Sequence, residues 1–96
     1  MEINTKSGFK CKVKENKVKD WRYITTSAKI AKSDDEITIV NGVAFLMEFL
    51  LGDDYERLLN HLEDDGVVDS CKLIAEYREI TTYIGEQLKK SQSSLE

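Results

Sequence analysis

Apolar and polar residues alternate with a period of two at the start of the chain, in EINTKSGFKCKVK, residues 2–14. Small or apolar residues occupy one side of the alternation and lysines the other: Ile3, Thr5, Phe9, Cys11 and Val13 against Lys10, Lys12 and Lys14. This period is that of a β-strand with one buried face, and Ser7-Gly8 is a turn pair between two such runs. The pattern predicts a β-hairpin over residues 2–14. Two strands alone are marginally stable, so the hairpin must pack on the rest of the chain.

After Asn16, a residue type that caps helices, the spacing of the apolar residues changes to three and four. This spacing predicts a helix over about residues 17–32. Its apolar positions are Val18, Trp21, Ile24 or Thr25, Ala28 and Ala31. The polar run SDDE then interrupts the pattern, and the β-branched ITIV at residues 37–40 is compatible with an extended segment.

Residues 43–51, VAFLMEFLL, are apolar at almost every position. A helix that is apolar on nearly every face must be buried on nearly every face, either in the core or against a partner. Asn41 or Gly42 precedes this run and Gly52 follows it, so we expect a helix over residues 42–51.

Two more helices are expected, over residues 53–63 and 69–89. Asp53 would cap the first, with Glu56 placed as in a capping box, and Asp69 or Ser70 would cap the second. The expected buried stripes are Tyr55, Leu58, Leu59 and Leu62 in the first helix, and Leu73, Tyr77, Ile80 or Thr81, Ile84 and Leu88 in the second. Residues 91–96 are expected to be a disordered polar tail.

Together these elements predict a predominantly helical α+β fold, with an N-terminal β-hairpin and about four helices in a single domain over residues 1–90. A chain of 96 residues with 41% hydrophobic and 33% charged residues is suited to one globular core. No apolar run approaches the roughly 18 residues of a membrane span, and the N-terminus lacks the apolar segment of a secretory signal. We therefore expect no membrane contact, and a protein that stays in the compartment where it is made.

Residues that could carry out chemistry do not form a motif. His61 is the only histidine, and no serine or cysteine nucleophile stands at a motif spacing from it. Cys11 and Cys71 lack the paired spacing of a zinc site, so we expect two reduced thiols. The glycines are isolated, which excludes a phosphate-binding loop, and the aspartate pairs stand at predicted helix boundaries, where acidic residues act as caps.

The dipeptide Asp69-Ser70 at a helix start is similar to the site at which acyl carrier proteins attach phosphopantetheine. Here Cys71 follows the serine in place of that family's leucine or methionine, and only 26 residues follow Ser70, too few for the rest of that fold. We therefore expect a protein that is not an enzyme and that binds neither a cofactor nor a metal.

Charge is divided unevenly along the chain. Nine basic and three acidic side chains give residues 1–32 a charge of +6, and the remaining 64 residues carry −10, which together make the net −4. The exposed lysines Lys10, Lys12 and Lys14 are candidates for a basic surface that contacts phosphates. The overall acidity, with an isoelectric point near 5.0, argues against nucleic acid as a partner. The uneven charge also suits head-to-tail self-association, or an ordinary solvated surface.

The order of the parts resembles the small tail assembly chaperones of long-tailed phages and prophages of Gram-positive bacteria. The matching residues are Ser7, Gly8 and Phe9; Asp20 and Trp21; Phe49 to Gly52; Tyr55, Leu58 and Leu62; and Asp65, Gly66, Val67 and Val68. Each of these motifs alone is common in helices and turns of many proteins. The resemblance depends on the order in which all of them occur along the chain. One departure is the loop SDDEITIVNG, which lacks the proline of the family.

The resemblance implies a cytoplasmic protein of the bacterial host cell that is absent from the mature virion. Such chaperones coat the helical tape-measure protein before tail-tube subunits polymerise around it, so the implied partners are the tape-measure protein and the tail-tube protein. The apolar surface needed for this contact is expected on the two central helices, at Phe45, Phe49, Tyr55 and Leu59. The alternative is a small regulatory or nucleic-acid-binding module that uses the basic hairpin.

Overall fold

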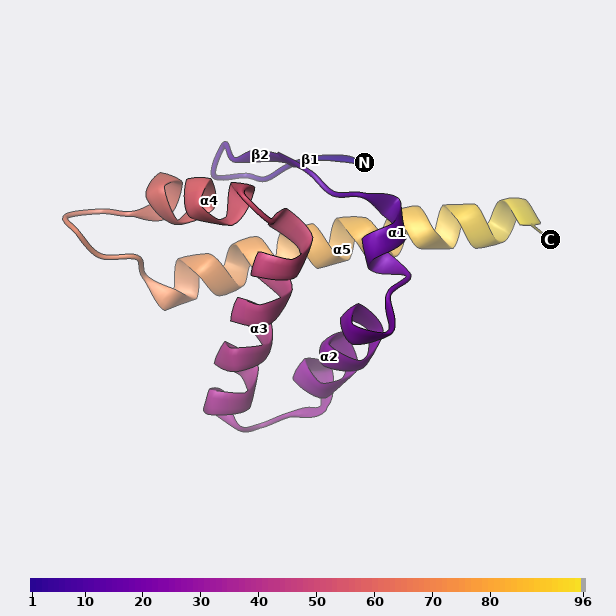
Figure 1. Cartoon of the computed structure of the whole chain (residues 1–96), viewed down its shortest axis with the longest axis horizontal. Coiled ribbons are helices and arrows are strands. Elements are labelled where there is room, and N and C mark those ends of the chain that lie inside the picture. Colours follow the sequence, from indigo (N-terminus) through magenta and orange to yellow (C-terminus); the bar gives the residue numbers. More distant parts are fainter. Residues whose placement is uncertain (96) are drawn as a thin grey trace.

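The computed structural model of the chain describes residues 1–95, and the side chains of residues 1–90. Two short strands are followed by five helices (Figure 1): β1 Glu2–Asn4, β2 Lys10–Lys12, α1 Glu15–Val18, α2 Trp21–Lys32, α3 Glu36–Leu51, α4 Asp54–Leu62 and α5 Ser70–Leu95. The fold is therefore a predominantly helical α+β fold with an N-terminal antiparallel hairpin, which confirms the predicted class.

The hairpin has the predicted faces. Ile3 pairs with Cys11, and the turn closes through the Gly8 N–H, which donates to the Thr5 carbonyl at 3.0 Å. Gly8 has a φ of 95°, a conformation that favours glycine. The alternating apolar side chains, among them Phe9 and Val13, are buried, while the lysines between them are exposed. A hydrogen bond also links the hairpin turn to α5: the Lys6 N–H donates to Glu79 Oε2 at 3.0 Å.

The helix predicted over residues 17–32 is in fact two helices. Lys14, and not Asn16, precedes α1, which ends at Val18. Asp20 then adopts an extended backbone conformation and caps α2, because its Oδ1 accepts a hydrogen bond from the Arg22 N–H at 2.8 Å. The chain changes direction at this break, so the apolar spacing does not run continuously from Val18 into α2.

The helix predicted over residues 42–51 begins six residues earlier than expected. Asp35 caps α3 at Glu36, accepting from the Thr38 N–H at 3.2 Å and from the Thr38 hydroxyl at 2.7 Å. The ITIV segment is thus helical and not extended, because a strong cap and tertiary packing outweigh the modest helix penalty of β-branched residues. Gly42 lies inside α3 against α2, where an added Cβ would stand 2.7 Å from Ile30 Cγ1.

The ends of the last two helices follow the sequence signals in part. Gly52 ends α3 as predicted, but the side chain of Asp53 makes no cap hydrogen bond, so the expected capping box is absent. Asp69, and not Ser70, caps α5, because its Oδ1 accepts from the Cys71 N–H at 2.8 Å. Helix α5 continues to Leu95, beyond its predicted end at residue 89. Residues 91–96 were predicted to be a disordered tail, but residues 91–95 continue α5, and residue 96 lies outside the described residues.

The molecule divides into two regions that we call the body and the arm (Figure 1). The body comprises the hairpin, α1, the end of α3 from residue 46, α4 and α5. The arm is residues 21–45, the α2–α3 pair, which extends from α5 on the side opposite the hairpin and α4. Of sixteen buried apolar side chains among the described residues, only Tyr23 and Val43 belong to the arm. The core therefore lies in the body.

Candidate partner-binding surface

Large apolar side chains that face solvent are concentrated on the arm. Six are exposed among the described residues, and five of these belong to residues 21–45: Trp21 at 75%, Ile24 at 49%, Ile37 at 70%, Val40 at 46% and Phe45 at 42%. The sixth is Val67, in the turn before α5. Large apolar side chains gathered in one region of a folded protein typically mark a contact surface.

Part of this surface is the apolar face of α2. Trp21, Ile24, Ala28 and Ala31 recur at intervals of three, four and three, and all four side chains are exposed. We call these four residues the α2 seam. The side of α2 turned inward carries Tyr23, Thr26, Ser27 and Ile30 instead. The sequence predicted one apolar face from Val18 to Ala31. The chain breaks at Asp20, so that Val18 of α1 is buried while the apolar positions of α2 are exposed.

A hollow beside the α2 seam separates α2 from α5. Its lining comes from both helices: Tyr23, Ile24, Ser27, Ile30 and Ala31 of α2, and Tyr77 and Thr81 of α5. We call it the α2–α5 groove. Burial raises the pKa of both tyrosine phenols above the ordinary value of 10.0, which keeps the floor of the groove uncharged at neutral pH. The groove is open to solvent, because α2 packs chiefly on α3 and little on α5.

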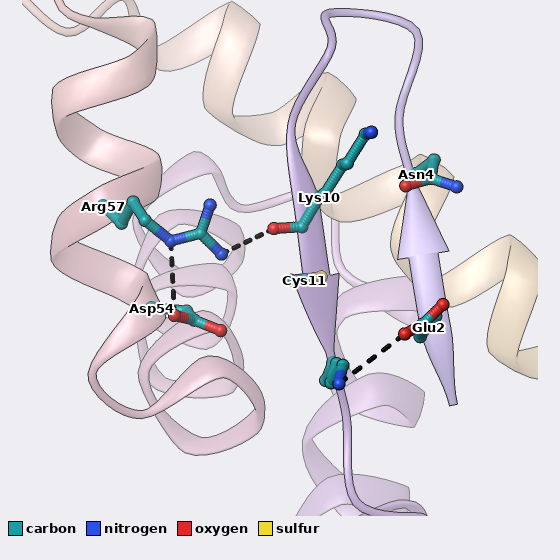
Figure 2. A pocket seen from close by; sticks show the side chains of 7 residues that line it. Glu2, Asn4, Lys10, Cys11, Asp54 and Arg57 are labelled. Atoms are coloured by element: carbon teal, nitrogen blue, oxygen red, sulfur yellow. Dashed lines mark hydrogen bonds and ion pairs between the residues drawn. The ribbon is translucent and has the colours of Figure 1, made fainter.

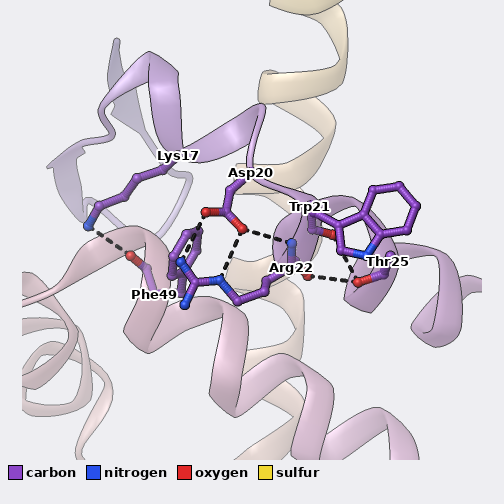
Figure 3. Close-up of polar contacts among 6 residues, drawn as sticks. All are labelled: Lys17, Asp20, Trp21, Arg22, Thr25 and Phe49. Atoms are coloured by element: carbon purple, nitrogen blue, oxygen red, sulfur yellow. Dashed lines mark hydrogen bonds and ion pairs between the residues drawn. The ribbon is translucent and has the colours of Figure 1, made fainter.

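Phe45 and Phe49 form a stacked pair on α3, with ring centroids 6.0 Å apart. Two cations cover Phe49: the Arg22 guanidinium lies 5.2 Å from the ring centroid, and Lys17 Nζ lies 5.7 Å away and donates to the Phe49 carbonyl at 2.8 Å (Figure 3). Asp20 holds Arg22 in place through two side-chain hydrogen bonds of 3.1 and 3.0 Å. Phe49 is therefore half-buried, and Phe45 presents the exposed ring of the pair.

The other two predicted contact residues lie on α4. Tyr55 is half-buried and packs against the core, and Leu59 is half-buried beside fully buried Leu58. Of the four residues expected to face a partner, Phe45 alone has an exposed side chain. Sequence reasoning missed Ile37 and Val40, which it took as compatible with an extended segment. It considered Trp21 only as an aromatic beside the basic hairpin, and it gave Ile24 no role at a surface.

The predicted basic surface is mixed in charge. Lys10, Lys12 and Lys14 are all exposed, but Lys12 Nζ lies 3.6 Å from Glu2 Oε1. A shallow hollow beside β2 also contains Asp54, whose Oδ1 pairs with Arg57 Nε at 3.3 Å, and Arg57 donates to the Lys10 carbonyl at 2.5 Å (Figure 2). Carboxylates among the lysines weaken attraction for phosphate, so this arrangement does not favour a nucleic-acid site.

The one histidine has a serine neighbour that its sequence position did not suggest. His61 Nε2 of α4 lies 3.2 Å from Ser7 Oγ and 3.1 Å from the Ser7 carbonyl, and its ring lies 5.7 Å from Phe9. Both His61 and Ser7 are exposed, and among the described residues no carboxylate hydrogen bond orients the ring. The contact ties the hairpin turn to α4.

The two cysteines differ in burial. Cys11 is buried beneath the hairpin, and burial raises the pKa of its thiol from 9.0 to about 11, whereas Cys71 is exposed at the start of α5. Within the described part of the chain, no three metal-binding side chains cluster together. No described helix combines the length and the apolar character needed to cross a bilayer.

Comparison of the chain with models of protein families, with curated proteins and with solved structures finds no match of any of the three kinds.

Proposed function

We propose that this protein is a non-enzymatic tail assembly chaperone of a phage or prophage. In this role it binds the helical tape-measure protein, keeps it soluble and helps to recruit tail-tube subunits. It acts in the cytoplasm of the bacterial host and leaves before the virion is mature. The ordered sequence motifs described above suggest the class of partner, and one structural observation carries the proposal: five large apolar side chains lie exposed on a single helical arm.

An exposed apolar arm suits a helper that shields another chain. A long helical protein waiting for its tube exposes apolar stripes and aggregates unless these stripes are covered. A helper must then present apolar surface of its own and still remain in solution. The net charge of −4 and the charged side chains of the body favour its solubility. Helix-on-helix contact through apolar stripes is the natural mode for two such proteins.

Co-expression with the long helical open reading frame encoded nearby tests this function. We expect a soluble complex, seen by size-exclusion chromatography with light scattering, in which several copies bind each partner. Trp21→Asp combined with Ile37→Asp should abolish this complex while leaving the fold unchanged, because these side chains are 75% and 70% exposed on the two helices of the arm. The matched control is Val67→Asp, since Val67 is 63% exposed but lies outside the arm.

Two results would contradict the proposal. The partner remains insoluble beside the wild-type chain, or the double variant of Trp21 and Ile37 retains the complex as well as Val67→Asp does. Circular dichroism of both variants confirms that each is folded before the comparison is made.

A further inference from the structure

We propose that the α2 seam and the adjoining α2–α5 groove receive one helix of the partner, an amphipathic helix whose apolar stripe is flanked by acidic side chains. This inference rests on the proposed function and makes it more specific: it selects α2 over the exposed side chains of α3, and it states the charge of the bound helix.

The spacing of the α2 seam is that of a helix that packs along another helix. Positions 21, 24, 28 and 31 follow the alternating three and four steps of a heptad seam, and none is covered by the chain itself. The two large residues, Trp21 and Ile24, supply apolar contact near the start of α2. The two alanines, Ala28 and Ala31, leave room for close approach of a second helix toward its end.

The groove extends this contact onto α5. Ile24 and Ala31 belong both to the α2 seam and to the lining of the groove, whose floor contains Tyr23 and Tyr77. A helix lying along the seam would therefore touch α2 on one side and α5 on the other. Trp21 points away from Phe49 and Arg22 into solvent, so it is free to cover the bound helix (Figure 3).

Charge around the site favours an acidic partner. Helix α2 contains no acidic residue, and Arg22 is already neutralised by its bidentate contact with Asp20. Lys32 of α2 and Arg78, which follows Tyr77 on α5, are exposed and form no ion pair among the described side chains. Two unpaired cations at the edges of the seam and the groove attract carboxylates and repel a basic helix.

A second copy of this chain does not suit the site through its own α2. In such a pair the bound α2 would bring lysines and no carboxylate, because α2 contains no acidic residue. The acidic helix α4 cannot serve either, because its apolar stripe is already in the core, with Leu58 fully buried and Leu62 8% exposed. We therefore take a helix of another protein as the occupant. A second copy bound through exposed Ile37 and Val40 of α3 would appear as self-association of the free chain in light scattering, and that result would overturn this choice.

Trp21 is the only tryptophan, so its fluorescence reports directly on the α2 seam. The first probe is a pair of synthetic amphipathic peptides with the same leucine stripe, flanked by glutamates in one and by lysines in the other. We expect the glutamate peptide to shift the Trp21 emission to shorter wavelength and to bind about tenfold more tightly at low salt. The preference should shrink as salt rises, because salt screens the exposed charges.

Ala28→Glu blocks the α2 seam with a larger and acidic side chain, and Ala75→Glu is its control, since Ala75 is exposed on α5 away from the groove. The first variant should lose about tenfold in affinity for the glutamate peptide, and the second should not. Equal binding by both variants, or binding without a change in Trp21 emission, would overturn the docking site.

The purified complex with the co-expressed partner separates this inference from the proposed function. A complex in which Trp21 stays as exposed to acrylamide quenching as in the free protein overturns the site and leaves the function standing. Absence of a complex, together with seam-dependent binding of the glutamate peptide, overturns the choice of partner and supports the site.

Discussion

The body and the arm use their apolar residues in opposite ways. In the body, side chains from the hairpin, α3, α4 and α5 meet in one core, and Phe9, Leu46, Leu58 and Ile80 are almost completely buried. In the arm, α2 and α3 pack on each other and leave five large apolar side chains in water. The body buries its large apolar side chains within the chain itself, whereas the arm leaves apolar surface that another molecule can cover.

This difference predicts that truncations in the two regions have unequal effects on stability. Leu58→Ala should lower the free energy of unfolding by about 2–5 kcal/mol, since it leaves a cavity in a closed core. Ile37→Ala should change it by less than about 0.5 kcal/mol, because its side chain is already in water. Urea denaturation followed by circular dichroism measures both. Equal losses would mean that the arm is packed as tightly as the body.

The second prediction concerns the packing of the arm on itself. Gly42→Val should cost about 1–3 kcal/mol, because the space for a Cβ is taken by Ile30, whose Cγ1 would lie 2.7 Å from it. Gly85→Ala in α5 is the contrasting variant: nothing lies within 4 Å of an added Cβ there, so it should gain about 0.5–1 kcal/mol of helix stability. Thermal unfolding of the two variants compares them. A stable Gly42→Val protein would show that α2 and α3 are loosely joined.

The body was largely predictable from sequence because its patterns are local. The alternation over residues 2–14 and the stripe through Tyr77, Ile80 and Ile84 each repeat with a single period, and the structure buries both. The arm was predicted less well. An apolar stripe on a helix indicates which face is buried in a contact, but it does not indicate whether that contact is with the same chain or with a partner. Two acidic caps also decided its boundaries: Asp20 divides the first predicted helix, and Asp35 starts α3 earlier than the apolar run suggested.

The candidate site was predictable only in part. Phe45 is exposed as a contact residue should be, but Phe49 is covered by Lys17 and Arg22, which are 32 and 27 positions away in sequence. The contact of Ser7 with His61 likewise joins residues 54 positions apart. Such contacts between distant residues depend on how the helices and strands pack together. The periodicity within one segment does not indicate this packing.

The third prediction tests whether the body is optimised for stability. Glu76 of α5 is 4% exposed, and its Oε2 has no hydrogen-bond partner among the described residues. Glu76→Met should therefore raise the free energy of unfolding by about 1 kcal/mol, because it removes an unsatisfied buried polar atom. Glu79→Met is the matched control and should lower stability, since Glu79 accepts the Lys6 N–H at 3.0 Å. Loss of stability in Glu76→Met would mean that this carboxylate has a favourable role in the core.

The smallest effects are expected when pH is varied, and they fall at opposite ends of the scale in the two regions. Hydrogen bonds from Arg22 and Thr38 hold the pKa values of Asp20 and Asp35 below the ordinary 3.8. A carboxylate with a lowered pKa in the folded state stabilises it above pH 3.8, and this contribution is lost as pH falls through the folded value. The arm helices should therefore loosen first in acid.

In the body the sign is reversed. Burial raises the pKa of Cys11 from 9.0 to about 11, so its neutral thiol stabilises the fold below pH 9 and this contribution is lost as pH rises toward 11. Methyl signals in nuclear magnetic resonance spectra, which do not exchange with water, separate the two regions when followed from pH 2 to 11. Asp35→Asn keeps a capping side chain that cannot be protonated in this range, so it should reduce the acid sensitivity of α3. If the arm and the body lose their signals at one common pH in acid, the arm does not unfold independently, and its exposed surface is part of one cooperative unit with the core.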